Sequence, residues 1–304
     1  MAVKLENAKR IVFIINPNSG LSSKKEIKDK ILVFFEKKQK PVIVKFTKKV
    51  GDATEWAEKY SKMDDIESIV AVGGDGTVNE VANGIGISGK KMGIIRGGSG
   101  NGLARHLGIP ILLKKALEVI YESNSVAIDM MDINNRYSVN VSGVGFDAIV
   151  ANKFQNVETR GPVSYVRIIL TEFSSFKAQD YHIIADGKVM NIKAYLVSFA
   201  NSSQFGNNAL ISKSASVTDG YIDLCIIKPF PKVASPIVIE RLMTGRLDSS
   251  KYMEVIKAKE IILKQKSSVY HIDGDAIEGG NLLKIKLIHL ALNIIIPKNK
   301  INKI

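Results

Sequence analysis

Cysteine and long apolar stretches are scarce in this sequence, and each shortage excludes a class of protein. The 304 residues include a single cysteine, Cys225, which excludes an intrachain disulfide and favours a reducing compartment. No segment approaches the roughly 18 uninterrupted apolar residues of a membrane-spanning helix. The first apolar run, residues 11–15, is too short for the core of a signal peptide. We therefore expect a cytoplasmic protein that is at most peripheral to the inner face of the membrane.

Acidic side chains are outnumbered as well, and the imbalance indicates an anionic partner. Lysine and arginine total 43 against 30 aspartate and glutamate, for a formal net charge of +13. Residues 1–50 carry most of this excess, in lysines that either face an anionic membrane surface or form a solvated helix face. Aromatic residues make up only 7% and no nucleic-acid-binding motif is present, so we expect no nucleic acid as partner.

The apolar pattern changes near the middle of the chain. In the first 130 residues short apolar strands alternate with amphipathic helices, which predicts an α/β domain doubly wound around a parallel-type sheet. Turn-separated strands dominate the rest and predict a mainly antiparallel, sandwich-like β domain. Within this second half we expect three helices, at residues 146–154, 164–176 and 231–243.

The length also predicts two domains, at about 150 residues each. We place the first domain at residues 1–129, rejoined by residues 290–304, and the second at residues 130–289. Two domains without a linker favour a ligand-binding cleft between them.

The strongest chemical signal is a glycine-rich loop, residues 73–80, with the sequence Gly-Gly-Asp-Gly-Thr-Val-Asn-Glu. The loop follows an apolar strand and leads into a predicted helix. Glycines let the backbone approach a ligand closely, and the free N–H groups at the start of a helix favour phosphate. Asp75 within the loop would need an intervening Mg²⁺ ion or a hydroxyl group, or else it serves only as the N-cap of the helix.

Two further loops share this design. Residues 16–20 (Asn-Pro-Asn-Ser-Gly) follow the first strand, and residues 97–102 (Gly-Gly-Ser-Gly-Asn-Gly) follow the fourth. Loops at the carboxyl ends of parallel strands gather at one edge of the sheet. Three small polar loops at one edge predict a phosphate-binding site, whereas any one of them alone would be explained as a turn.

Acids in the second half supply candidates for catalysis. Asp273 and Asp275 flank a glycine directly after an apolar strand, where a carboxylate could accept the proton of an acceptor hydroxyl. A purely structural turn is the alternative explanation. Asp219, followed by glycine and tyrosine, is by itself more typical of such a turn.

These motifs together resemble the diacylglycerol kinase and sphingosine kinase superfamily, and above all its soluble bacterial lipid kinases. The resemblance covers nearly the whole chain. It implies a lipid kinase that uses ATP and Mg²⁺ to phosphorylate the hydroxyl of diacylglycerol or of a related lipid at an anionic membrane surface. The first domain would then be the nucleotide-binding catalytic domain, and the second would bind the lipid.

The resemblance also implies nucleotide and metal contacts in the first domain. Asp75 would lie beside the catalytic Mg²⁺ ion, with Asp129 as a further member of the same acidic network. The implied contacts with ATP are Asn16, Pro17, Asn18, Ser19, Gly20, Thr47, Gly73, Gly74, Asp75, Gly76, Thr77, Asn79, Glu80, Gly98 and Ser99.

In the second domain the resemblance implies a general base and a structural metal ion. Asp273 would take the proton of the lipid hydroxyl, and Asp275 would be the third position of the same catalytic motif. Asp219, with help from the backbone of Ser216 and Tyr221, would hold a structural Mg²⁺ ion.

Three departures from the family pattern keep alternatives open. Asp275 stands where the family has glutamate, Gly102 lacks the acid that follows the loop asparagine, and Arg96 replaces a proline. A sphingoid base is therefore an alternative acceptor. A kinase of a soluble metabolite such as NAD is another alternative, and a non-catalytic nucleotide- or lipid-binding protein is a third. A homodimer is also left open.

Overall fold

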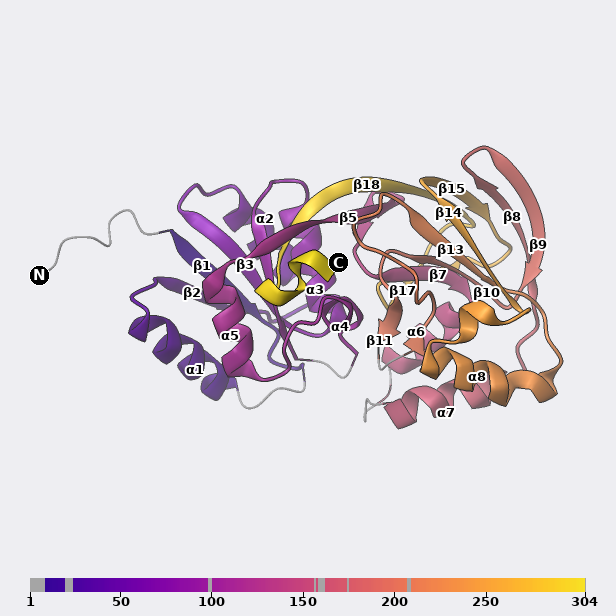
Figure 1. The fold of residues 1–304 in the computed structure, drawn as a ribbon, viewed down its shortest axis with the longest axis horizontal. Coiled ribbons are helices and arrows are strands. Elements are labelled where there is room, and N and C mark those ends of the chain that lie inside the picture. The colour runs from indigo at the N-terminus through magenta and orange to yellow at the C-terminus, as the bar shows by residue number, and fades with distance from the viewer. Residues whose placement is uncertain are drawn as a thin grey trace, which may run out of the picture. The chain divides into compact units, whose positions relative to one another are not determined.

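The computed structural model describes residues 9–19, 24–97, 100–155, 157, 162–173, 175–206 and 209–303 (Figure 1). The chain divides into two compact units. The first comprises residues 1–128 with 290–304, and the second comprises residues 129–289, which is one residue from the boundary expected from the sequence. Two strands, β5 (Ser125–Ile133) and β18 (Leu282–Ile295), carry the chain from one unit to the other.

A parallel sheet forms the centre of the first unit, as the sequence predicts. Its order is β2-β1-β3-β4, and the end of β18 adds a further parallel neighbour to β4. The strands are apolar because both faces of the sheet are covered, and Phe13 and Val70 are fully buried. Their bounds are β1 (Arg10–Ile15), β2 (Val42–Phe46), β3 (Ile66–Gly73) and β4 (Lys91–Arg96).

Amphipathic helices pack on this sheet. Ile27, Ile31 and Phe35 recur at four-residue spacing in α1 (Lys24–Lys37), so they share one face and are buried. The ring of Phe35 lies 5.4 Å from that of Phe13 on β1, centroid to centroid. The other helices of the unit are α2 (Asp52–Ser61), α3 (Asp75–Ile85), α4 (Gly102–His106), α5 (Leu113–Glu122) and the 3₁₀ helix η3 (Lys298–Lys303).

Two antiparallel sheets form a sandwich in the second unit, which confirms the predicted fold class. One sheet joins β18, β15, β8 and β9, and the other has the order β14-β13-β10-β7-β16-β17. Buried residues of both sheets, among them Ile261 and Phe199, form one core. The strands are β6 (Arg136–Ser138), β7 (Val141–Gly145), β8 (Gln179–Ala185), β9 (Lys188–Ala194), β10 (Leu196–Ala200), β11 (Gln204–Gly206), β12 (Ala209–Leu210), β13 (Ile222–Ile227), β14 (Met253–Ala258), β15 (Glu260–Lys264), β16 (Val269–Ile272) and β17 (Asp275–Glu278).

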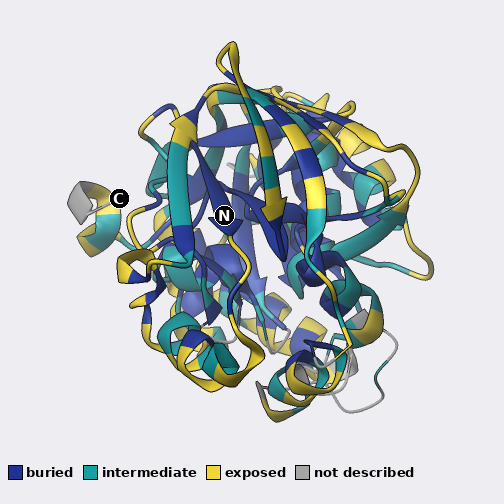
Figure 2. Ribbon diagram, turned by 90° about the vertical axis from the view of Figure 1, so that its right-hand side faces the viewer, coloured by how far each residue is buried: buried dark blue, intermediate teal, exposed yellow. Residues whose placement is uncertain are grey.

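Strands β15 and β8 show the period of two that a half-buried sheet requires. In β15 Ile261 and Leu263 are buried, whereas Glu260, Ile262 and Lys264 are exposed. In Figure 2 buried, intermediate and exposed residues follow one another along the strands that face the viewer.

Three helices form a further layer on the six-stranded sheet. The helices expected from the sequence are present as α6 (Phe146–Gln155), α7 (Pro162–Phe173) and α8 (Ser235–Thr244), accompanied by the 3₁₀ helices η1 (Lys232–Ala234) and η2 (Leu247–Ser249). Their apolar residues form a second core with Leu196, Cys225 and Ile227 of the sheet. Within the described part of the chain, no helix is long and apolar enough to span a membrane.

Candidate active site

The described parts of the three glycine-containing loops lie at one edge of the parallel sheet. The amide of Asn16, after β1, donates to the carbonyl of Val72 at 2.9 Å. The amide of Gly97, after β4, donates to the carbonyl of Gly73 at 2.8 Å. The side-chain amide of Asn16 also lies 3.3 Å from Thr77 Oγ1. Hydrogen bonds therefore hold the three loops together at the carboxyl ends of their strands.

The loop after β1 is a turn closed by its first asparagine. Asn16 Oδ1 accepts the amide of Asn18 at 2.9 Å, and the carbonyl of Asn16 accepts the hydroxyl of Ser19 at 2.7 Å. Pro17 between them restricts the backbone further. These contacts define the conformation of the loop up to Ser19, and Gly20 lies outside the described residues.

The loop after β3 enters α3 past a position, Gly73, where the Thr77 side chain leaves no room for a Cβ atom. A Cβ atom on Gly73 would lie 2.4 Å from Thr77 Oγ1. Gly74 is the N-cap of α3, in an extended conformation and without a side-chain cap. The N–H groups of a first helical turn, here from Asp75 to Thr77, have no carbonyl partner inside the helix, so this end of α3 suits a phosphate group.

Asp75 joins the loop after β3 to the loop after β4. Its Oδ2 accepts the amide of Asn101 and its Oδ1 accepts the amide of Gly102, each at 2.8 Å. A Cβ atom on Gly100 would lie 2.6 Å from Asp75 Oδ2, so the close approach requires glycine there. Asp75 therefore positions the loop after β4, and its link to a catalytic Mg²⁺ ion stays a prediction.

Two arginines give the same edge positive charge. Arg105 Nε donates to the carbonyl of Gly100 at 2.7 Å, and Arg96 Nη1 lies 3.5 Å from the carbonyl of Ile109. Burial, and then the charge of Arg105, lower the pKa of Arg96, whereas the charge of Asp75 opposes this shift. Guanidinium groups beside glycine loops suit a polyphosphate ligand.

The remaining nucleotide contacts implied by the resemblance have varied surroundings. The amide of Thr47, after β2, donates to the carbonyl of Ile15 at 3.0 Å. Asn79 is only 2% exposed, so it faces the interior of the unit. Glu80 Oε2 accepts the amide of Ala53 at 3.1 Å and so caps α2. Gly98 and Ser99 lie outside the described residues.

Asp273 in the second unit is a buried carboxylate that organises a neighbouring turn. It is 4% exposed. Its Oδ1 accepts the hydroxyl of Ser138 at 2.5 Å and the amide of Asn140 at 3.0 Å, and its Oδ2 accepts the amide of Val139 at 2.9 Å. These contacts favour a structural role, in which the carboxylate fixes the start of β7.

Asp275 lies two residues later in a different environment. Ile272 and Asp275 pair across a hairpin whose two central residues, Asp273 (φ 51°) and Gly274 (φ 93°), both have positive φ, as a type I′ turn requires. This turn makes Asp275 the first residue of β17, where it is half-buried. Of the two acids, Asp275 is the more accessible to a substrate.

Asp129, the second acid implied for the catalytic metal, is fully buried in the second unit. Its Oδ2 accepts the amide of Gly220 at 2.8 Å, and its Oδ1 lies 2.7 Å from His289 Nδ1. Asp129 therefore anchors the loop that precedes β13. Asp75 belongs to the first unit, so a metal shared by the two acids stays a prediction.

The residues implied for a structural Mg²⁺ ion do not fit that ion. Asp219 Oδ1 accepts the amide of Tyr221 at 3.1 Å, and Asp219 Oδ2 lies 2.7 Å from the ammonium of Lys257. The hydroxyl of Ser216 lies 3.2 Å from that of Thr218. A lysine thus holds the position that a cation would take. The described residues include no group of three or more His, Cys, Asp or Glu side chains arranged to hold a metal ion.

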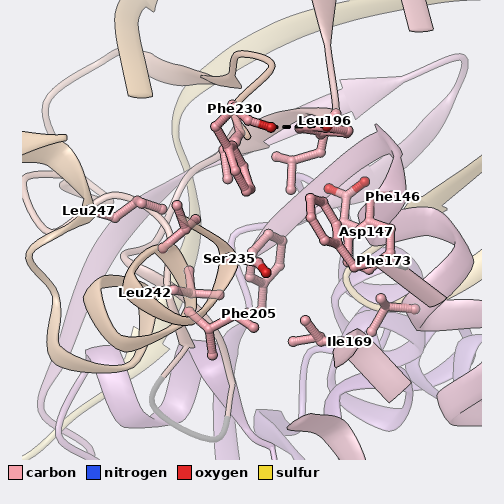
Figure 3. Close-up of a pocket in the computed structure, with 15 residues that line it drawn as sticks. Phe146, Asp147, Ile169, Phe173, Leu196, Phe205, Phe230, Ser235, Leu242 and Leu247 are labelled. Carbon is pink, nitrogen blue, oxygen red and sulfur yellow. Dashed lines mark hydrogen bonds between the residues drawn. The ribbon is translucent and has the colours of Figure 1, made fainter. Parts of the chain in front are cut away.

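An apolar pocket, whose lining residues the sequence did not predict, lies between the helical layer and the six-stranded sheet. The empty space among its lining residues, open solvent included, is roughly 600 Å³. In Figure 3 the side chains of Leu242 and Leu247 lie on one side of the pocket, and those of Phe146 and Ile169 lie on the other. The rings of Phe146 and Phe173 are 5.3 Å apart, centroid to centroid.

Asp147 is the only charged side chain among the described residues that line this pocket. Its Oδ2 accepts the hydroxyl of Ser198 at 2.7 Å and lies 3.2 Å from His271 Nε2. His271 Nδ1 accepts the amide of Gly274 at 3.3 Å, so the ring carries its proton on Nε2 and donates to Asp147. A Cβ atom on Gly143 would lie 2.4 Å from Asp147 Oδ2. Through its contacts with Asp147 and Gly274, His271 links the pocket wall to the turn that holds Asp273 and Asp275.

Both units match described protein families. Residues 10–133 match the model of the diacylglycerol kinase catalytic domain, and residues 140–295 match the model of the YegS C-terminal NAD kinase beta sandwich-like domain. Two curated proteins named diacylglycerol kinase, from Staphylococcus aureus strains bovine RF122 / ET3-1 and MRSA252, are each 32% identical to this chain over 286 residues. The match covers 90% of this chain and 88% of each relative.

Solved structures share the fold. The crystal structure of a diacylglycerol kinase from Bacillus anthracis strain Sterne superposes with a TM-score of 0.76 at 20% identity, over 98% of this chain and 100% of that one. A second solved chain from the same strain gives a TM-score of 0.79 at 21% identity with the same coverage.

Proposed function

Because this chain belongs to the diacylglycerol kinase family and is a kinase, we propose that it transfers the γ-phosphate of ATP, with Mg²⁺, to the hydroxyl of diacylglycerol or of a related lipid. The catalytic-domain match and the named relatives support the kinase activity. The apolar pocket of the second unit is the observation that carries the choice of a lipid acceptor.

The first unit offers what a triphosphate requires. The glycine loops bring backbone N–H groups and the start of α3 to one edge, and Arg96 and Arg105 add positive charge there. Phosphoryl transfer depends mainly on such positioning and on neutralising charge at the phosphate oxygens. A bound Mg²⁺ ion would add to that neutralisation, and we assign Asp75 to hold it through water.

We assign the carboxylate that orients the acceptor hydroxyl to Asp275. Asp273 is 4% exposed and its oxygens accept three hydrogen bonds, so a hydroxyl would have to displace existing donors. Asp275 is more accessible, and a general base must come within hydrogen-bond reach of the proton that it takes. The family resemblance implied Asp273 as the general base. Our assignment moves this role two residues along the chain, to Asp275.

We assign the acyl part of the acceptor to the pocket lined by α6, α7 and α8. The described residues of its lining are aromatic or aliphatic apart from Asp147 and Ser235, which is the chemistry that a hydrocarbon chain prefers. Asp147 also supports a second candidate acceptor, a sphingoid base, because a buried carboxylate can pair with the amine of such a lipid.

Exposed lysines of the first unit support an anionic membrane surface as partner. Lys28, Lys37 and Lys38 are exposed on and just after α1. Leu32 and Val33 of the same helix are 37% and 50% exposed. Basic residues attract anionic headgroups by about 1 kcal/mol each, and exposed apolar side chains add contact with the lipid.

A transfer assay tests the proposed function. Purified protein is incubated with radiolabelled ATP and Mg²⁺ and with diacylglycerol, sphingosine, ceramide or NAD. We expect label in phosphatidic acid, the product from diacylglycerol. Label in sphingosine phosphate would select the second candidate, and label only in the product from NAD would contradict a lipid acceptor.

A further inference from the structure

In the second unit a lysine side chain, Lys257, pairs with an aspartate of the loop that precedes β13. The ammonium of Lys257 lies 2.7 Å from Asp219 Oδ2 and 2.9 Å from Asp223 Oδ1. Lys257 on β14 lies directly opposite Asp223 on β13, so the strand register fixes one of these contacts. Asp219 belongs to the loop that precedes β13, so the lysine connects that loop to the sheet.

Hydrogen bonds occupy the other oxygens of both aspartates. Asp219 Oδ1 accepts the amide of Tyr221 at 3.1 Å, and Asp223 Oδ2 accepts the hydroxyl of Ser212 at 2.6 Å. The Asp223 side chain is only 2% exposed, so its charge requires a partner. Burial opposes the charge of Lys257, but the hydrogen bonds to the two aspartates outweigh it and raise the pKa of Lys257.

A divalent ion at Asp219 would have to break this arrangement. Mg²⁺ takes oxygen ligands in near-octahedral geometry, at about 2.0–2.1 Å. The ammonium of Lys257 offers no lone pair, and at hydrogen-bond distance from the same carboxylate it would repel a second cation. The position is therefore both filled and protected by a positive charge.

We propose that Lys257 replaces the structural metal ion in this chain. Its ammonium bridges Asp219 and Asp223 and holds the loop before β13 on the sheet without a divalent cation. The proposal concerns the folding of the second unit, so it stands or falls independently of the acceptor lipid.

Thermal unfolding without nucleotide tests the proposal. The wild-type chain is compared with Lys257→Met in excess EDTA and in MgCl₂, with sodium chloride matching the ionic strength. We expect the wild-type unfolding temperature to be the same in both solutions. Lys257→Met should unfold roughly 5–10 °C lower in EDTA, because it leaves a buried charge unpaired, and Mg²⁺ should restore part of that loss.

Matched variants separate this role from a general loss of charge. Lys259→Met removes a neighbouring lysine that lies near the Tyr221 ring instead of the aspartates, and should leave the unfolding temperature unchanged. Lys257→Arg keeps the cation and should unfold close to the wild type. If Lys257→Met fails to fold, the wild type decides the question. A wild-type unfolding temperature that falls in EDTA and recovers in Mg²⁺, with that response lost in Asp219→Asn, would overturn the proposal. So would Lys257→Met unfolding at the wild-type temperature.

Discussion

At the scale of single residues, Asp273 and Asp275 show how two neighbouring acids acquire different environments. The type I′ turn reverses the chain between them, which buries Asp273 among three donors and leaves Asp275 accessible. The sequence predicted that acids at this turn matter, because an aspartate-glycine pair after an apolar strand is a local signal. It could not predict which acid is buried, because Ser138, Val139 and Asn140 reach Asp273 from more than 130 positions away.

Replacing the accessible acid should affect turnover alone. Asp275→Asn keeps the size of the side chain but removes its basicity, so we expect turnover to fall about 10²–10⁴-fold. The KM for ATP and the unfolding temperature should stay at their wild-type values. Asp275→Glu, which restores the residue that the family pattern has there, is the matched control and should keep activity. Near-normal turnover of Asp275→Asn would exclude Asp275 as the base.

Replacing the buried acid should affect stability first. Asp273→Asn puts an NH₂ group where a carboxylate oxygen accepts a hydrogen bond, so we expect the free energy of unfolding to fall by about 1–3 kcal/mol. Urea unfolding measures this loss. Asp180→Asn is the control, since the Asp180 side chain in the same unit is 68% exposed. Unchanged stability together with a large loss of turnover would return the role of base to Asp273.

At the scale of elements, helices α6, α7 and α8 could be predicted from the sequence, whereas the residues that line the pocket beneath them could not. Their periodicity revealed the helices, but the pocket arises only when all three pack on the six-stranded sheet. No sequence motif identified Asp147, because its partners Ser198 and His271 come from the distant strands β10 and β16. The glycine loops could be found because each follows its own strand directly, and a parallel sheet brings such loops to one edge.

Filling the pocket should discriminate between acceptors by chain length. Leu242→Trp adds bulk to the lining, so we expect the KM for long-chain diacylglycerol to rise about tenfold or more, with a smaller rise for a short-chain analogue. Ile237→Trp on the same helix is the control, because Ile237 is 59% exposed and does not line the pocket. Equal KM values for both chain lengths in Leu242→Trp would contradict the assignment of the pocket to the acyl chain.

The short helix α4 should make the first unit sensitive to acid. Burial lowers the pKa of His106 from 6.5 to about 4. Between these values the unfolded chain binds a proton that the folded chain does not, so stability falls as the pH drops from about 6.5 to about 4, by up to about 3 kcal/mol. Urea unfolding across this range measures the slope, and His106→Gln should flatten it. An unchanged slope in His106→Gln would assign the sensitivity to other groups.

At the scale of the whole molecule, the sequence was informative about the number of units and their fold classes. Apolar strands buried on both faces and strands that alternate every second residue are patterns that a single sequence displays. The net charge of +13 also follows directly from the sequence. Whether this charge can attract an anionic membrane surface depends on which lysines remain exposed. The structure also shows that acids partly neutralise two of these lysines, because Lys30 and Lys40 pair with Glu26 and Glu67.

Binding to anionic vesicles should weaken as salt rises. Exposed charges are screened beyond a Debye length of about 10 Å at 0.1 M salt, so sedimentation with phosphatidylserine vesicles should decrease with increasing sodium chloride. Replacing Lys28, Lys37 and Lys38 with glutamine should remove most of the binding. Replacing Lys188, Lys193 and Lys264 of the second unit removes the same charge and should have little effect. Binding that does not respond to salt would leave the α1 lysines as a solvated face only.

The passage of β18 from the second unit to the first restricts how the protein can be dissected. Its Asn293 and Ile294 pair with Lys91 and Met92 of β4, so a fragment that stops at residue 128 would leave the backbone of β4 unpaired along that side. A recombinant catalytic half made in this way should aggregate. Joining residues 290–304 to this fragment through a short designed linker should restore the missing strand. The resulting catalytic unit should then be soluble enough to be purified alone.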